Sequence, residues 1–236
     1  MINMSIPTAH FVRSFVRRSG RLTPSQRDAI DRLLPTLGIP AEGAIDVKAL
    51  FGREAPLWIE VGFGDGDALL EAAERHPEAN FLGVEVHEPG VGRALRGIDA
   101  RDLGNVRVAC TDAVPLLTDR IDPASAARFV LLFPDPWPKK RHHKRRIVQR
   151  PFVRLVAGIL RVGGVFHTAT DWAPYAEHML EVLSAEPSFR NCHGEGNYAP
   201  APGEQRLETK FERRGLRLGH GVFELEFERT DLEAGL

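Results

Sequence analysis

From Pro56 to Leu183 the chain alternates between short apolar runs typical of buried strands and longer stretches typical of helices. Parallel strands need long crossover connections, so this alternation predicts an α/β fold with a mostly parallel sheet covered on both faces. Residues 223–228 alternate strictly between apolar and acidic side chains, which predicts an antiparallel edge strand with one solvated face. The expected parallel strands are residues 57–61, 81–86, 106–110, 129–133 and 165–170.

A glycine-rich turn, Gly62-Phe63-Gly64-Asp65-Gly66, joins the first expected strand to the helix that follows it. Glycines in this position permit positive φ angles and let a ligand approach the backbone, so the turn is typical of a nucleotide-type binding loop. The spacing falls short of the full dinucleotide fingerprint, and a tight turn without a ligand is the alternative.

Acidic residues mark the ends of three successive strands. Glu60 lies two residues before the glycines, Glu85 lies near the end of the second strand, and Asp112 follows the third. The carboxyl ends of parallel strands meet at one edge, so these carboxylates are expected to share a crevice, with Asp65 and Asp67 beside it. Such a crevice suits ribose hydroxyls and positive charge better than a pyrophosphate, and S-adenosylmethionine has both features. Singly, each acid could instead cap a helix or lie at the surface.

The segment from Phe129 to Val148 combines a strand, a prolyl turn and the densest positive run of the sequence. The turn, Pro134-Asp135-Pro136-Trp137, places one carboxylate at the expected edge of the sheet, and Trp137 either stacks on a base or packs beneath the loop. Clustered cations bind nucleic-acid phosphates, so the segment predicts chemistry on a polynucleotide. No metal is expected, because the run would repel it. The run comprises Lys139, Lys140, Arg141, His142, His143, Lys144, Arg145 and Arg146.

The N-terminal region contributes a helix and a second basic segment. Thr23 and Gln26 have the spacing of a capping box around Pro24, and Pro35 is expected to end that helix. The basic segment before the helix is either a solvated arm or a second contact with a polyanion. Its arginines are Arg13, Arg17, Arg18 and Arg21.

The overall composition of the chain limits which classes of protein it can belong to. A net charge of −1 excludes a uniformly basic nucleic-acid binder but allows a local basic face. No stretch approaches the roughly 20 apolar residues that span a bilayer, so no membrane partner is expected. The first residues lack the features of a signal peptide. Cys110 and Cys192 belong to no CxxC pair, which predicts reduced, buried thiols in a cytoplasmic protein.

Five segments carry a more specific pattern: LWIEVGFGDG at 57–66, GVEVHEPGVG at 83–92, FPDPWPKKRHHKRRIVQRPF at 133–152, GGVFHTATDWAPYAEHML at 163–180 and ETKFERRGLRLGHGV at 208–222. Together with the basic N-terminal segment, they resemble successive motifs of the bacterial tRNA (guanine-N7)-methyltransferase family, the TrmB type. The resemblance extends from about His10 to Arg229, and the prolyl turn with its basic run is highly specific to that family. Small departures at Val61, Pro138 and Lys140 remove none of the functional groups implied.

The resemblance implies a class I S-adenosylmethionine-dependent methyltransferase fold, a Rossmann-like sheet of seven strands with the last antiparallel. We expect residues 1–50 to form a basic arm and short helix packed on a methyltransferase domain at residues 51–236. The implied cofactor is S-adenosylmethionine and the implied partner is tRNA, methylated at N7 of its variable-loop guanine. The sequence leaves open whether the protein is a monomer or a homodimer.

The resemblance also implies residue roles. Asp135 is the implied catalytic residue and a cofactor ligand. The other cofactor positions are Glu60, Gly62, Glu85 and Asp112. The substrate positions are Lys139, Asp171, Thr209, Lys210, Phe211 and Glu212. The RNA-interaction segment comprises Arg141, His142, His143, Lys144, Arg145 and Arg146.

Some of these residues could instead have a purely structural role. Asp171 could be the N-cap of the helix that follows it, and Thr209 with Glu212 has the spacing of a capping box.

Guanine N7 already carries a lone pair, so its methylation needs no deprotonation. Asp135 is therefore assigned to electrostatic stabilisation and positioning rather than to general-base catalysis.

Two other functions fit the sequence less well. A nicotinamide-dependent dehydrogenase is disfavoured by the incomplete fingerprint and the acidic crevice. A non-catalytic RNA-binding module with a methyltransferase-like fold would bind RNA without methyl transfer.

Overall fold

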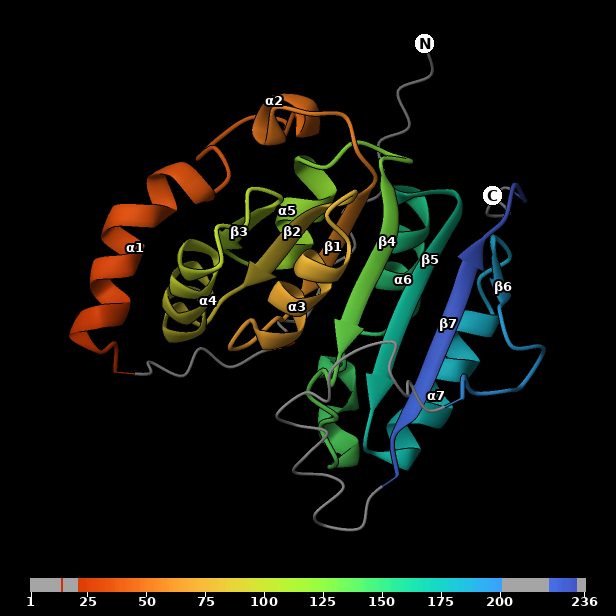
Figure 1. The fold of residues 1–236 in the computed structure, drawn as a ribbon. Coiled ribbons are helices and arrows are strands. Elements are labelled where there is room, and N and C mark those ends of the chain that lie inside the picture. Colours follow the sequence, from red (N-terminus) through yellow and green to blue (C-terminus); the bar gives the residue numbers. More distant parts are fainter. Residues whose placement is uncertain (1–13, 15–20, 201–220, 233–236) are drawn as a thin grey trace.

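The computed structural model describes residue 14, residues 21–200 and residues 221–232 of the 236-residue chain. Within this part of the chain, seven strands form one sheet in the order β3-β2-β1-β4-β5-β7-β6 (Figure 1). Strand β7 is antiparallel to both of its neighbours and the other neighbouring pairs are parallel, which confirms the predicted fold class. The strands are β1 (Leu57–Val61), β2 (Asn80–Glu85), β3 (Val106–Cys110), β4 (Ala126–Leu132), β5 (Leu160–Thr170), β6 (Phe189–Asn191) and β7 (Phe223–Arg229).

Three details of the sheet differ from the sequence predictions. Strand β6 was not predicted, because three residues are too few to show a periodicity. It pairs with β7, so β7 is not the edge strand. The fifth strand was expected at residues 165–170, but β5 begins at Leu160. The register with β4 shifts between Ala126 and Arg128, and Gly163 has a φ of 78°, so the glycine lies in an irregularity within the strand.

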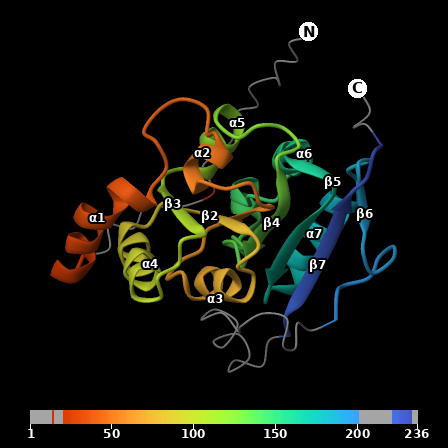
Figure 2. The same cartoon turned by 45° about the horizontal axis from the view of Figure 1, so that its top comes forward.

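Helices cover both faces of the sheet. Helices α1, α3 and α4 pack on one face, and α5, α6 and α7 pack on the other. Figure 2 shows α3 and α4 on one side of β2 and α5 on the opposite side. The helices are α1 (Pro24–Leu37), α2 (Val47–Phe51), α3 (Asp67–Arg75), α4 (Glu88–Ala100), α5 (Ala113–Asp119), α6 (Arg150–Ile159) and α7 (Ala173–Ser184), with a 3-10 helix η1 (Lys140–Arg145).

Helix α1 begins as predicted but ends later. The Thr23 hydroxyl accepts from the Gln26 N–H at 3.2 Å, and the Gln26 side chain accepts from the Thr23 N–H at 2.9 Å, which confirms the capping box. The prediction that Pro35 ends the helix is wrong, because α1 continues to Leu37. A proline in the last turn removes only one helical hydrogen bond. Packing of Leu34 and Leu37 against the apolar layer under α4 offsets that loss.

The prediction that both cysteines are buried is wrong. Cys110 is partly exposed at the end of β3, and Cys192 is exposed just after β6. The outcome at Cys192 follows from the sheet, because the short outermost strand leaves the residue after it at the surface.

Candidate active site

The carboxyl ends of β1 to β4 meet at one edge of the sheet, and the glycine turn lies along this edge. Its three glycines have φ angles of 75°, 57° and 85° at Gly62, Gly64 and Gly66, a region that residues with a Cβ rarely adopt. A Cβ at Gly62 or Gly64 would meet no atom within 4 Å, whereas a Cβ at Gly66 would lie 2.8 Å from that of Ala94. The first two glycines therefore present backbone to open space, and the third allows close packing on α4.

The carboxylate of Glu85 is oriented by three backbone N–H groups. Its Oε2 accepts from Gly64 at 2.9 Å, and its Oε1 accepts from Val86 at 2.7 Å and His87 at 2.9 Å. A carboxylate offers about four lone-pair sites, so acceptor capacity remains mainly on Oε2. These bonds fix the end of β2 to the glycine turn and hold the carboxylate as an acceptor beside it.

Glu60 and Asp112 occupy the ends of the neighbouring strands. Glu60 is nearly buried, with 8% of its surface exposed. Asp112 is the N-cap of α5, and its Oδ1 accepts from the Val114 N–H at 3.2 Å. The capping alternative therefore holds for Asp112, although the residue keeps its place at the sheet edge.

Asp135 is exposed on a turn of unusual backbone geometry. Phe133 and Trp137 flank it with φ angles of 51° and 43°, and Pro134 and Pro136 restrict the backbone between them. Such angles cost of order 1–3 kcal/mol each and persist where surrounding structure enforces them, often at functional sites. The turn therefore holds one exposed carboxylate at the carboxyl edge of the sheet.

Trp137 packs between the basic run and Ser14. Its indole N–H donates to the carbonyl of Ser14 at 3.1 Å. The ring of His142 meets the indole edge-on at 5.7 Å between centroids, and the guanidinium carbon of Arg145 lies 5.0 Å from the indole centroid. Of the two roles considered for Trp137, these contacts correspond to packing. Arg13, Arg17 and Arg18 lie outside the described residues.

The basic run occupies η1 and the residues on either side of it, and its side chains differ in exposure. Loss of hydration, followed by the positive charges of Arg141 and Arg145, lowers the pKa of His142, so the lysines and arginines supply the charge at neutral pH. The exposed cations are Lys139, Lys140, Arg141 and Lys144; His142, His143 and Arg145 are partly exposed, and Arg146 is buried.

Of the remaining substrate positions, only Asp171 lies in the described part of the chain. The alternative in which Asp171 caps α7 is wrong: the N-cap is Trp172, whose N–H donates to the hydroxyl of Thr170 at 3.3 Å. The hydroxyl of Thr170 thus bonds the N–H at the start of the helix. Thr209, Lys210, Phe211 and Glu212 lie outside the described residues.

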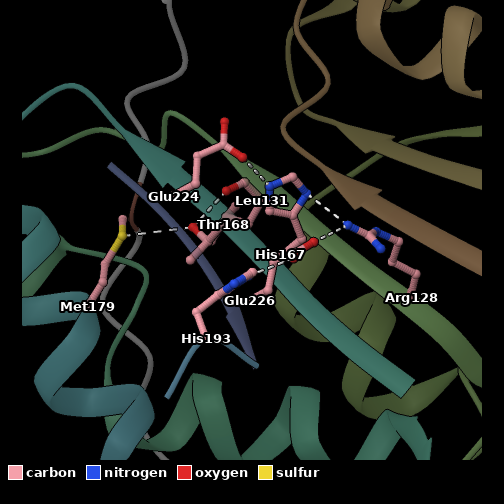
Figure 3. Close-up of polar contacts among 8 residues, drawn as sticks. All are labelled: Arg128, Leu131, His167, Thr168, Met179, His193, Glu224 and Glu226. Atoms are coloured by element: carbon pink, nitrogen blue, oxygen red, sulfur yellow. Dashed lines mark hydrogen bonds and ion pairs between the residues drawn. The ribbon is translucent and has the colours of Figure 1, made fainter. Parts of the chain in front are cut away.

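A polar network that the sequence does not reveal crosses β4, β5 and β7. Figure 3 shows His167 between Arg128 and Glu224, at 3.3 Å and 2.9 Å respectively. Glu226 accepts from Arg128 at 2.6 Å and contacts His193 at 3.1 Å. Glu224 is 4% exposed, so the face of β7 predicted to be solvated is partly buried. These residues line a trough of about 660 Å³ that also reaches Glu60.

Replacing Glu226 with glutamine is expected to lower the free energy of unfolding at pH 7 by about 1–3 kcal/mol, because a partly buried ion pair is broken. Burial alone would raise the pKa of Glu226, but the charge of His167 and the bonds from His193 and Arg128 outweigh it and lower the pKa below the usual 4.5. The carboxylate therefore stabilises the fold above pH 4.5, and this stabilisation is lost as the pH falls through the lowered pKa.

Chemical denaturation from pH 7 to pH 3 measures this effect. The difference between wild type and Glu226→Gln should shrink below pH 4.5, and a difference that stays constant would contradict the assignment. Glu42→Gln, at an exposed position, controls for the loss of one negative charge.

Within the described ranges, no group of three or more His, Cys, Asp or Glu side chains is placed to hold a metal ion. No helix of this part of the chain is long and apolar enough to cross a membrane.

A mostly parallel sheet with this strand order, a glycine turn after β1 and acids at the ends of β1, β2 and β3 define a class I S-adenosylmethionine-dependent methyltransferase fold. Solved structures agree. The 16S rRNA methyltransferase KamB superposes with a TM-score of 0.60 at 16% identity, over 82% of this chain and 98% of that one. The SAM-dependent O-methyltransferase of Thermotoga maritima superposes with a TM-score of 0.51 at 15% identity, over 90% of this chain and 74% of that one.

Sequence comparison identifies the family more narrowly. Residues 54–225 match the family described as "Putative methyltransferase". The tRNA (guanine-N(7)-)-methyltransferase of Yersinia pestis (strain Pestoides F) is 53% identical over 93% of this chain and 92% of its own length. The enzyme of the same name from Pseudomonas paraeruginosa (strain DSM 24068 / PA7) is 53% identical over 93% of this chain and 90% of its own length. The chain belongs to the tRNA (guanine-N(7)-)-methyltransferase family.

Proposed function

We propose that this protein transfers a methyl group from S-adenosylmethionine to N7 of the variable-loop guanine of tRNA, in the cytoplasm. The observation that carries the proposal is the position of Asp135, an exposed carboxylate between the acidic edge of the sheet and an exposed basic run. The curated relatives, 53% identical over 93% of the chain, carry the name of this activity. We further propose that residues 51–236 form the catalytic domain and residues 1–50 an extension packed on it.

The residues of the sheet edge fit S-adenosylmethionine, which supplies an electrophilic methyl group on a sulfonium. The open space beside Gly62 and Gly64 leaves room for a ligand against the backbone. The Oε2 of Glu85 retains capacity to accept a ribose hydroxyl. Glu60 and Asp112 add negative charge, which suits the ammonium and sulfonium groups and disfavours a pyrophosphate.

Gly90, which sequence reasoning did not single out, supports the same site from α4. A Cβ at this position would overlap the carbonyl oxygen of Gly64. Gly90→Ala is therefore expected to displace the glycine turn and to weaken S-adenosylmethionine binding about tenfold or more, since overpacking costs about 1–3 kcal/mol. Isothermal titration calorimetry measures this affinity.

Gly158→Ala is the matched control for Gly90→Ala. Gly158 also lies in a helix, and a Cβ there would meet no atom within 4 Å. Equal cofactor affinities in the two variants would show that α4 does not support the turn.

The proposed role of Asp135 follows from the chemistry of the acceptor. Guanine N7 has a lone pair and needs no base to remove a proton before attack. The reaction requires that the guanine ring is held in place and that N7 approaches the methyl group in line with the bond that breaks. The methylated guanine gains positive charge. The carboxylate of Asp135 stabilises that charge, and it can accept from the N1–H and the exocyclic amine to orient the base.

The proposed grip on tRNA comes from the cations after the turn. Lys139 lies closest to Asp135 in sequence, and together with Asp171 it is proposed to contact the substrate nucleotide. The exposed side chains of Lys140, Arg141 and Lys144 are proposed to bind backbone phosphates. Substrate contacts are also proposed for Thr209, Lys210, Phe211 and Glu212, and RNA contacts for His142, His143 and Arg145.

The test uses purified protein, labelled S-adenosylmethionine and two tRNA transcripts. One transcript is unmodified, and the other carries 7-deazaguanine in place of the variable-loop guanine and so lacks the acceptor nitrogen. We expect transfer to the first and none to the second, with the label mapped to N7. Methylation of another atom would contradict the proposal. Tight tRNA binding without transfer by cofactor-bound protein would identify a non-catalytic RNA-binding module instead.

A further inference from the structure

Arg146 differs from the other cations of the basic run in its surroundings. Only 4% of its surface is exposed, whereas its neighbour Lys144 is exposed and Arg145 is partly exposed. A cation that binds phosphate must reach the surface, and Arg146 is directed into the protein.

The guanidinium of Arg146 is held by three groups. Its Nε donates to the carbonyl of Pro136 at 2.9 Å, and a terminal nitrogen lies 3.2 Å from Nε2 of His143. Its central carbon lies 4.7 Å from the ring centroid of Tyr175. The planar fork of arginine suits this combination of directed hydrogen bonds and ring stacking, which a lysine cannot reproduce.

Tyr175 provides a rigid base for this contact. The residue is fully buried in α7, and its hydroxyl accepts from the Val148 N–H at 3.3 Å. Burial is the main cause that raises the pKa of Tyr175, the positive charge of Arg146 opposes the rise, and the charge of Asp135 adds to it. The phenol is therefore neutral, and its ring lies against the guanidinium of Arg146.

Pro136 is the residue that immediately follows Asp135. Its carbonyl belongs to the turn whose flanking residues, Phe133 and Trp137, have positive φ angles. A strained turn keeps its shape only when its surroundings enforce it. The bond from Arg146 connects this turn to the core through Tyr175.

We propose that Arg146 is a positioning residue for methyl transfer: it holds the turn that presents Asp135, and it does not bind tRNA phosphate. This inference rests on the role proposed for Asp135. Loss of the bond leaves the Pro136 carbonyl without its charged donor and lets the turn shift. A displacement of about 1 Å in a reacting group can lower a rate by about 100-fold.

The experiment compares Arg146→Met and Arg146→Lys with Lys144→Met in the full-length protein. Single-turnover transfer is measured at saturating tRNA and S-adenosylmethionine, and each rate is divided by the number of cofactor-binding sites. The tRNA dissociation constant is measured between 50 and 300 mM KCl. Binding through phosphate contacts weakens by about tenfold or more over this range, so the salt slope can be determined.

We expect Arg146→Met to lower the rate per binding site by about 30- to 100-fold and Arg146→Lys by about tenfold, because lysine restores one donor. Neither variant should change the salt slope of tRNA binding. Lys144→Met should instead lower that slope by about one and weaken tRNA affinity. In an Asp135→Asn background, Arg146→Met should lower the rate per binding site by less than about threefold relative to Asp135→Asn alone. The effects of residues that act through one another are not additive.

A rate per binding site within about twofold of wild type in Arg146→Met would overturn the proposal, because a positioning residue must contribute to stabilisation of the transition state. A reduced salt slope in either Arg146 variant would also overturn it and make Arg146 a phosphate contact. If Arg146→Met does not fold, Arg146→Lys decides by the same two criteria. Wild-type protein without transfer activity would refute the proposed function instead, before any variant is compared.

Discussion

Asp135→Asn is expected to lower the rate of methyl transfer by about 10²–10³-fold, because it removes the negative charge that stabilises the cationic methylated base while keeping the size of the side chain. Asp135 is exposed and its turn is held by other residues, so the fold should be retained. Single-turnover transfer at saturating tRNA and S-adenosylmethionine measures the effect. Cofactor affinity is measured separately, since Asp135 is also a proposed cofactor ligand.

Asp31→Asn is the matched control for Asp135→Asn. Asp31 is exposed on α1, and the substitution removes the same charge away from the sheet edge. The role given to Asp135 requires its variant to be slower than this control by at least an order of magnitude. Similar rates in the two variants would show that its charge plays no part in the reaction.

Replacing Lys140, Arg141 and Lys144 together with alanine is expected to lower the salt slope of tRNA binding by two to three, because each phosphate contact contributes about 0.9 to that slope. At 0.1 M salt the affinity should fall by about one to two orders of magnitude, and the loss should be similar for different tRNA sequences. All three side chains are exposed, so the fold should be unaffected.

The control for this triple variant removes three exposed cations elsewhere, Lys48, Arg154 and Arg161. Both variants have the same net charge, so any difference between them reflects position rather than total charge. Filter binding or fluorescence anisotropy over a range of KCl concentrations gives both slopes. Equal slopes in the two variants would place the tRNA on another surface.

Much of the fold could be read from local patterns. The first five strands and the antiparallel last strand were predicted from apolar periodicity, because the side-chain spacing of a strand depends only on its own residues. The capping box at Thr23 and Gln26 was predicted for the same reason: its bonds join residues three apart. The acids Glu60, Glu85 and Asp112 were located at strand ends once the sheet was inferred to be parallel.

Predictions failed where distant contacts decide the outcome. Pro35 would end an isolated helix, yet α1 continues because its last turn packs on the apolar layer under α4. Strand β7 has the pattern of an edge strand, yet β6 pairs with its outer side. Glu224 lies on the face of β7 predicted to be solvated, yet it is buried beside His167, a partner 57 residues away in the sequence.

The sequence by itself determined the order of strands and helices, the glycine turn and the presence of Asp135 beside a basic run, because those features depend on neighbouring residues. Only the tertiary structure decided which cations of the run face solvent. Arg145 and Arg146 are chemically identical neighbours, and no local pattern separates them. The buried ring of Tyr175 and the carbonyl of Pro136 draw one guanidinium inward, since a buried charge requires partners that only the folded chain supplies.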